Sequence, residues 1–335
     1  MNQIAPLGAI FLAAWLCVLP ARAASIQTYA FTAAGQSSCA TFAPTTQVST
    51  TIGSGSIEVS TPGPGCGVTE SLMDLTSAAG LLTSSSAAAG GGNTSFGNFS
   101  YSGTSRAQGD YMTLGVEAEG TLSGATDAFS TRGSEAFVKM TDGYTVPSFT
   151  GPNGFVQFNY VVHGTQTVSG RGETTVELLY AKDGSPGFLA FRAQNAAGTG
   201  TTVNVNGTYV TALPGMIITT DSITMNTALS FLVPASSNEH FGLSMVLYAS
   251  ALPGPGSAVS SPSSIADDFF GTLTLTSINV LDSRGNVVSG AQVSRDSAAI
   301  GAAASPEPGN MLLVGAALVG VSLLLKARSR AAENI

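Results

Sequence analysis

The sequence predicts an all-β protein, most simply an antiparallel, jelly-roll-like β-sandwich. Short runs of alternating apolar and polar residues recur along the chain, and Gly, Asp, Asn or Pro separates them. No amphipathic helix interrupts these runs between the two apolar ends of the chain. Strands at this spacing favour a sandwich over a parallel sheet. A β-helix stays open as the alternative, because the chain is rich in Gly, Ser and Thr, although no fixed-period repeat is visible.

The clearest strand is expected at Phe155–Val162, where Val156, Phe158, Tyr160 and Val162 share one face, as in a half-buried strand. Further strands are expected at Tyr111–Ala118, Ala136–Met140, Thr174–Tyr180, Phe188–Arg192, Thr202–Thr211, Ile217–Met225, Ala228–Val233, Phe241–Tyr248 and Gly271–Leu281.

Departures from regular alternation mark a bulge and three irregular segments. The apolar phase changes in the last strand, which predicts a bulge near Thr276-Ser277. The Ala/Ser/Gly tract Ser77–Asn93 and the Pro-rich stretch Ser250–Ser264 are interpreted as loops or linkers. Ser297–Ser305 is expected to be a flexible stalk.

The N-terminus has the pattern of a secretory signal peptide. Leu7–Leu19 is an apolar stretch of suitable length, and the small-residue pattern Ala21-Arg22-Ala23 follows it. Cleavage is therefore expected between Ala23 and Ala24, which assigns residues 1–23 to the signal peptide and residues 24–296 to an extracytoplasmic β domain.

Signal-peptide cleavage would remove Cys17 and leave two cysteines in an oxidising compartment. Cys39 and Cys66 are therefore expected to form a disulfide, which would stabilise the domain by roughly 3 kcal/mol through loop closure. A metal site or a reactive thiol is less favoured, because no histidine stands at metal-ligand spacing and no neighbour would activate a thiol.

Composition excludes nucleic acid as a partner. The chain carries 20 acidic and 12 basic side chains, a formal charge of −8, and only 10% charged residues. The electrostatic field of such a chain repels phosphates and anionic glycans, whereas neutral sugars and cation-bridged polymers are not excluded as ligands.

The C-terminus reads as a membrane-sorting tail. Pro306, Glu307 and Pro308 precede an apolar run at 311–325, and Lys326, Arg328 and Arg330 follow it. An apolar helix partitions into lipid, and a basic cluster behind it stays on the cytoplasmic side. The run is short for a membrane span, so a marginal or temporary anchor is expected.

This tail, residues 306–330, resembles the PEP-CTERM sorting signal of Gram-negative bacteria. The resemblance implies handling by a membrane protease or transpeptidase of the exosortase type, with cleavage or transfer close to the triplet. It also implies an association with exopolysaccharide, and a destination at the cell surface or in the extracellular medium after an inner-membrane stage.

Candidate catalytic residues are sparse. Glu117 and Glu119 share one strand face, and Glu173 and Glu177 are close in sequence; a glycosidase needs such a carboxylate pair. Solvated strand faces explain both pairs more simply. The only histidines, His163 and His240, stand in no nucleophile motif, and surface or turn positions are expected for both.

No cofactor is expected, and structural calcium is the open alternative. Asp267-Asp268 and the turn Asp282–Asn286 offer hard oxygen ligands, but neither completes a calcium loop.

These observations favour an exported, surface-sorted structural or adhesive protein of the cell envelope without catalytic activity. A carbohydrate-binding module associated with exopolysaccharide is the alternative, and a glycoside-active enzyme comes third.

Overall fold

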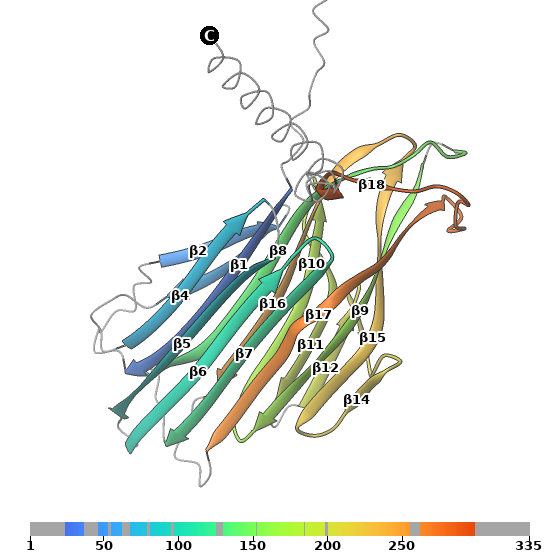
Figure 1. The fold of residues 1–335 in the computed structure, drawn as a ribbon. Coiled ribbons are helices and arrows are strands. Elements are labelled where there is room, and N and C mark those ends of the chain that lie inside the picture. Colours follow the sequence, from blue (N-terminus) through green and yellow to red (C-terminus); the bar gives the residue numbers. More distant parts are fainter. Residues whose placement is uncertain are drawn as a thin grey trace, which may run out of the picture.

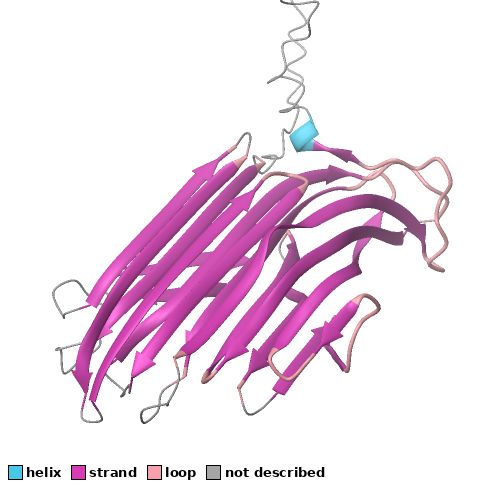
Figure 2. Ribbon diagram, turned by 60° about the horizontal axis from the view of Figure 1, so that its bottom comes forward, coloured by secondary structure: helices cyan, strands magenta, loops and turns pink. Residues whose placement is uncertain are grey.

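The computed structural model describes residues 24–298 apart from 37–45, 53–54, 62–67, 79–80, 95–96, 125–129, 152, 184, 198–199 and 255–261. Within these residues the chain is almost entirely antiparallel β-strand, which confirms the all-β class (Figures 1 and 2). The strands are β1 (Ser25–Gln36), β2 (Thr46–Ile52), β3 (Gly55–Thr61), β4 (Val68–Ser77), β5 (Leu82–Thr94), β6 (Gly97–Gly109), β7 (Thr113–Gly124), β8 (Ser130–Thr145), β9 (Asn153–Ser169), β10 (Gly172–Lys182), β11 (Phe188–Ala196), β12 (Gly200–Val205), β13 (Thr208–Val210), β14 (Met216–Ile218), β15 (Ser222–Ser236), β16 (His240–Pro253), β17 (Ser263–Asp282) and β18 (Ser294–Arg295).

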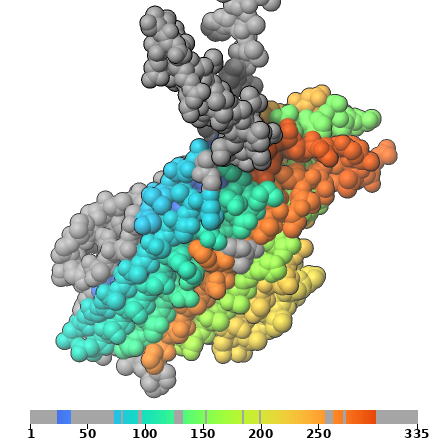
Figure 3. All heavy atoms as spheres, viewed as in Figure 1, coloured from blue at the N-terminus to red at the C-terminus, as the bar shows by residue number. Residues whose placement is uncertain are grey.

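Two large sheets account for most of these strands. The larger sheet has the order β13-β12-β11-β10-β16-β8-β1-β4, with β18 also paired to β8. The smaller sheet has the order β14-β15-β9-β17-β7-β6-β5, and β2 and β3 form a separate hairpin. Figure 3 shows one face of the molecule, on which β17 (orange) lies between the β6–β7 region (teal) and the β9–β15 region (green to yellow).

Most predicted strands coincide with observed ones, which generally extend further. Two predicted runs are each interrupted by a turn. Thr202–Thr211 divides into β12 and β13 at Asn206-Gly207, where both residues have positive φ (49° and 82°), and the region from Ile217 onward divides into β14 and β15. The predicted bulge is confirmed, because the β17–β9 register shifts between Leu275 and Ser277.

Apolar side chains from both sheets meet in one core. Val156, Phe158, Tyr160 and Val162 of β9 are all buried, as the alternation predicts. The Phe158 ring of the smaller sheet meets Tyr144 of the larger sheet edge to face, with centroids 5.0 Å apart. The sheets therefore face one another across a shared apolar layer.

At the β1–β5 end, short polar side chains replace large apolar ones. The hydroxyl oxygens of Thr28 and Ser84 are 2.7 Å apart, and a Cβ added to Gly90 would stand 2.7 Å from the Ala34 carbonyl oxygen. The two sheets can approach this closely only because β5 carries such small residues.

The loop prediction for Ser77–Asn93 is therefore wrong. Most of this region belongs to strand β5, which comprises the thirteen residues Leu82–Thr94. β5 pairs with β6 along its full length. Ala, Ser and Gly have low strand propensity, but strand pairing and close sheet contact outweigh that preference. The predicted Ser250–Ser264 connection is also shorter than expected, because β16 continues to Pro253 and β17 starts at Ser263.

A second apolar cluster covers part of the reverse face of the larger sheet. It comprises Tyr29, Phe31, Ala33, Phe137, Ala181 and Val246, and the Tyr29 and Phe137 rings stack with centroids 4.8 Å apart. Strand β2 contacts β10 and β16, so the β2–β3 hairpin lies against this sheet.

The segment after β17 is fixed to β8 through a buried carboxylate, Asp142. Arg295 Nε donates to Asp142 Oδ2 at 3.0 Å, while the Ser297 amide and hydroxyl donate to the two carboxylate oxygens at 3.0 and 2.6 Å. Asp142 is fully buried. We call Asp142, Arg295 and Ser297 the C-terminal clamp.

Several predicted features lie outside the described residues. These are the signal peptide with its cleavage site at Ala23, Cys39 and Cys66, and the tail with Pro306, Glu307, Pro308, Lys326, Arg328 and Arg330. Among the residues that are described, no helix has the length and apolar character needed to cross a bilayer.

Candidate functional site

The predicted carboxylate pair Glu117 and Glu119 lies on the outer face of β7, where Glu117 forms an ion pair with Arg106. Glu117 is buried and accepts a 2.9 Å hydrogen bond from Arg106 Nε, and the Arg106 guanidinium also lies 4.4 Å from the Phe270 ring centroid. Glu119 is exposed. Partial burial and then the nearby carboxylates Glu117 and Asp268 raise the pKa of Glu119.

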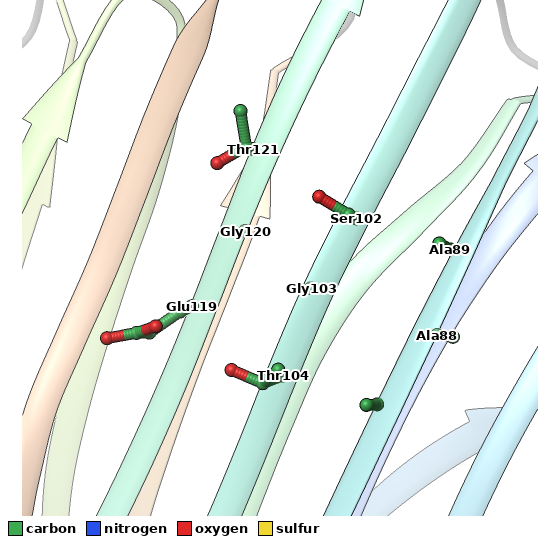
Figure 4. Close-up of a pocket in the computed structure, with 9 residues that line it drawn as sticks. Ala88, Ala89, Ser102, Gly103, Thr104, Glu119, Gly120 and Thr121 are labelled. Carbon is green, nitrogen blue, oxygen red and sulfur yellow. The ribbon is translucent and has the colours of Figure 1, made fainter.

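Glu119 borders a shallow hollow of about 420 Å³ on the outer face of β5, β6 and β7 (Figure 4). Ser102, Thr104 and Thr121 share this face, and Figure 4 shows their short side chains beside bare Gly103 and Gly120. The glycines are required on the inner side, where an added Cβ would stand 2.3–2.4 Å from the Tyr101 hydroxyl. The hollow is open and shallow, and the hydroxyl groups of its floor lie among alanines and glycines.

The second predicted pair, Glu173 and Glu177, lies on the outward face of β10. Glu177 forms a 2.6 Å ion pair with Arg192, and Glu173 accepts a 3.1 Å hydrogen bond from Gln194. Both carboxylates are thus engaged by side chains of the neighbouring strand β11, as on an ordinary strand face.

The remaining predicted ligands are separated by the fold. His163 is exposed on β9, and His240, at the start of β16, lies 3.2 Å from a carboxylate oxygen of Asp296. Asp267 points into the interior, whereas its neighbour Asp268 points outward. Within the described residues, no three His, Cys, Asp or Glu side chains form a group that could hold a metal ion.

The Asp282–Asn286 turn uses its own oxygen ligands internally. Asp282 Oδ1 accepts 2.8 Å hydrogen bonds from the backbone amides of Arg284 and Asn286. These hydrogen bonds lower the pKa of Asp282, and those donated by Asn286 contribute most. The carboxylate therefore serves as a turn cap.

A cleft of about 520 Å³ opens where the ends of β10 and β11 meet β15. Two aromatic rings line it, and the Phe188 ring stacks on the Tyr180 ring with centroids 5.6 Å apart. The Tyr180 ring also stacks on the buried core residue Phe231, with centroids 4.1 Å apart. Phe188 is 48% exposed, and Leu232 across the cleft is 43% exposed. We call this the aromatic cleft.

Polar groups are fixed along the same cleft. Lys182 Nζ donates to the Pro234 carbonyl oxygen at 2.8 Å and pairs with Glu239, while Asp183 Oδ2 accepts a 2.6 Å bond from the Gly242 amide. These partners hold the Lys182 and Asp183 side chains in defined positions. Partial burial raises the pKa of Tyr180, which keeps its hydroxyl neutral.

An apolar ring surface beside a few fixed polar groups is the usual composition of a small-molecule binding site. An exposed aromatic ring can pack against the apolar face of a sugar, while Lys, Asp and Ser side chains bind its hydroxyls. Sequence analysis missed this cleft. The available signal was the pair of aromatic residues, Tyr180 and Phe188, placed on either side of a turn containing Lys182, Asp183 and Ser185.

Comparison with known proteins gives no assignment: no family model, no curated protein and no solved structure matches this chain.

Proposed function

We propose that this chain is an exported, surface-sorted adhesive protein of the cell envelope, built on an antiparallel, jelly-roll-like β-sandwich, and that its aromatic cleft binds neutral carbohydrate. The aromatic cleft is the observation that carries the binding part of the proposal. It combines an exposed ring, Phe188, with the fixed polar side chains of Lys182 and Asp183.

Charge favours a neutral ligand. The chain has an excess of acidic groups, and Lys182 is already paired with Glu239, so the cleft offers no unpaired cation for a uronate or sulfate.

The sorting part of the proposal comes from the tail. Its likeness to PEP-CTERM signals supports processing by an exosortase-type enzyme. It also supports a membrane-anchored stage during export. The C-terminal clamp supports a display role, because it fixes the chain at Ser297, close to the point where the tail begins.

Carbohydrate binding is tested with the purified mature protein on arrays of neutral and acidic glycans. We expect retention on neutral glycans that falls at least tenfold in Phe188→Ala. Ile217→Ala is the matched control, because Ile217 is also a highly exposed apolar residue, at 66%, but lies on β14 outside the cleft. No binding to any glycan would leave only the structural role.

Sorting is tested separately by intact mass and cell fractionation in the native host. We expect the mature protein to begin at Ala24 and to end close to Pro306–Pro308. A variant with Pro306→Ala and Pro308→Ala should stay in the inner membrane. If both proteins keep residues 311–335 and fractionate alike, the tail is only an anchor.

A further inference from the structure

A layer of polar side chains crosses the interior where apolar side chains would be expected. In the larger sheet, Thr174, Asn195 and Thr201 stand side by side on β10, β11 and β12, because Thr174 pairs with Asn195 and Asn195 pairs with Thr201. In the smaller sheet, Gln166 of β9 pairs with Asp267 of β17. We call these five residues the polar layer.

Hydrogen bonds place the two halves of the polar layer against each other. Gln166 Nε2 donates to the Ala193 carbonyl oxygen of β11 at 3.2 Å, and Ala193 is two positions from Asn195 on the same strand face. The same Gln166 amide lies 3.3 Å from Asp267 Oδ2. Asp267 also forms a hydrogen bond with the backbone of Ser250 on β16. The next residue on β16, Ala251, pairs with Thr174 of β10.

The polar layer contains more hydrogen-bonding atoms than it satisfies. Gln166, Thr174 and Asp267 are fully buried and Asn195 is 1% exposed. Within the part of the chain that the structure describes, six side-chain atoms of the polar layer have no hydrogen-bond partner: Asp267 Oδ1, Gln166 Oε1, Thr174 Oγ1, Thr201 Oγ1, and both amide atoms of Asn195. Because a buried polar atom without a partner destabilises the folded state, such a concentration points to a ligand.

The chemistry of these atoms selects the ligand class. Five of the six are oxygens, from one carboxylate, two amides and two hydroxyls, which is the donor set of a hard cation. Burial raises the pKa of Asp267 well above its usual range, and the Gln166 and Ser250 bonds offset this only in part. Burial therefore allows Asp267 either as the neutral acid or as a carboxylate beside a positive charge.

Charge balance favours a monovalent ion. Asp267 is the only carboxylate in the polar layer. The nearby carboxylates Glu135 and Glu177 belong to the reverse face of the larger sheet, and Asp268 faces outward from the smaller sheet. A single positive charge would neutralise the layer, whereas a divalent ion would leave a buried excess charge.

A surface hollow lies one residue beyond the polar layer along β10, β11 and β16. An open hollow of about 580 Å³ is lined by Glu173, Ala196 and Leu252, which directly adjoin Thr174, Asn195 and Ala251 in sequence. Arg171 and Gly172 of the β9–β10 turn complete its rim. Solvent therefore reaches the residues that flank the layer.

We propose that the polar layer is a binding site for one monovalent hard cation, with Na⁺ as the ion that Asp267 Oδ1 and the neutral oxygens of Gln166, Asn195 and Thr174 coordinate. The site is independent of the aromatic cleft, and its occupancy locks the two sheets together at this end.

Thermal unfolding of the mature protein tests the site. NaCl replaces choline chloride from 0 to 200 mM at constant ionic strength. We expect a saturable rise of about 3 °C in Tm for the wild type and none for Asp267→Asn. Asp268→Asn is the matched control, because it removes the adjacent, outward-facing carboxylate; it should keep the full response to Na⁺.

Broadening of the ²³Na resonance by the wild type and by Asp268→Asn gives a second readout that does not depend on whether Asp267→Asn folds. No saturable Na⁺ response and no broadening would overturn the proposal. The proposal would also be overturned if Asp267→Asn had a higher Tm than the wild type in every salt, because Asp267 would then be a neutral buried acid. A response to CaCl2 alone would overturn the monovalent assignment.

Discussion

The Ser297 hydroxyl donates a 2.6 Å hydrogen bond to Oδ2 of Asp142, across 155 positions of sequence. The Gly143 amide and the Ser297 amide donate to the other oxygen, Oδ1, at 2.9 and 3.0 Å. With Arg295 Nε on Oδ2, the fully buried carboxylate accepts four hydrogen bonds, and the one from Arg295 is also an ion pair. The last described residues are thus part of the folded body, although sequence analysis expected a flexible stalk from Ser297 onward.

Removing the clamp carboxylate should be costly. Asp142→Ala leaves the Arg295 guanidinium, whose side chain is only 12% exposed, without its charge partner, so we expect a loss of about 3–5 kcal/mol in the free energy of unfolding. Urea denaturation measures this loss. Asp296→Ala, which removes an exposed partner of His240, should cost less than about 1 kcal/mol. Equal losses in the two variants would contradict a special role for Asp142.

The close contact between β1 and β5 should not tolerate a larger residue at position 90. In Gly90→Ala the added Cβ meets the Ala34 backbone 2.7 Å away, which cannot yield as a flexible side chain would. We expect a loss of about 1–3 kcal/mol, measured by urea denaturation. Ala87→Ser on the exposed face of the same strand is the control and should change stability by less than about 0.5 kcal/mol.

Glu135 should make stability depend on pH. It lies on the reverse face of β8, paired with Phe31 and Ser250, and burial raises its pKa from 4.5 to about 7. The folded protein therefore holds this proton more tightly than the unfolded chain. The contribution of Glu135 to stability is complete below pH 4.5 and is lost as the pH rises to about 7.

A Glu135→Gln variant isolates this effect. Its stability relative to the wild type should increase between pH 4.5 and 7, by up to about 3 kcal/mol. Thermal or urea unfolding across this range measures the difference. A constant difference between the two proteins at every pH would show that Glu135 titrates normally.

The two acidic residues on β7 should behave differently. Glu117 is buried under its ion pair with Arg106, so Glu117→Ala should cost about 1–2 kcal/mol in the free energy of unfolding. Glu119 is exposed and has like charges beside it, so Glu119→Ala should be neutral or slightly stabilising. A larger loss in the Glu119 variant would require a partner for that carboxylate in the folded protein.

Sequence periodicity was sufficient for the strands whose apolar residues alternate strictly. β9 is the clearest case, since burial of Val156, Phe158 and Tyr160 determines which face points inward. β5 could not be recognised in this way, because Ser84, Ser86 and Ala88 face inward without a large apolar side chain among them. Its burial depends on β1 of the other sheet, which is 56 positions away in sequence at the Thr28–Ser84 contact, and local propensity does not report this contact.

For the candidate sites too, local sequence predicts the face on which a residue lies, but it does not predict the partners that other strands supply. Glu117 and Glu119 were correctly placed on one strand face, but the Arg106 partner comes from the register between β6 and β7. The polar layer left a weak trace in the sequence: Thr174 occupies the same phase as buried Val176 and Leu178. Only the pairing of the strands brings Thr174 beside Asn195 and opposite Asp267.

The C-terminal clamp also has a mechanical consequence. A pull applied to the chain beyond residue 298 would be transmitted through Ser297 and Arg295 to β8, which lies between β1 and β16 within the larger sheet. Both neighbours pair with β8 over twelve positions, so the load would be shared in shear by many hydrogen bonds at once instead of opening them one by one.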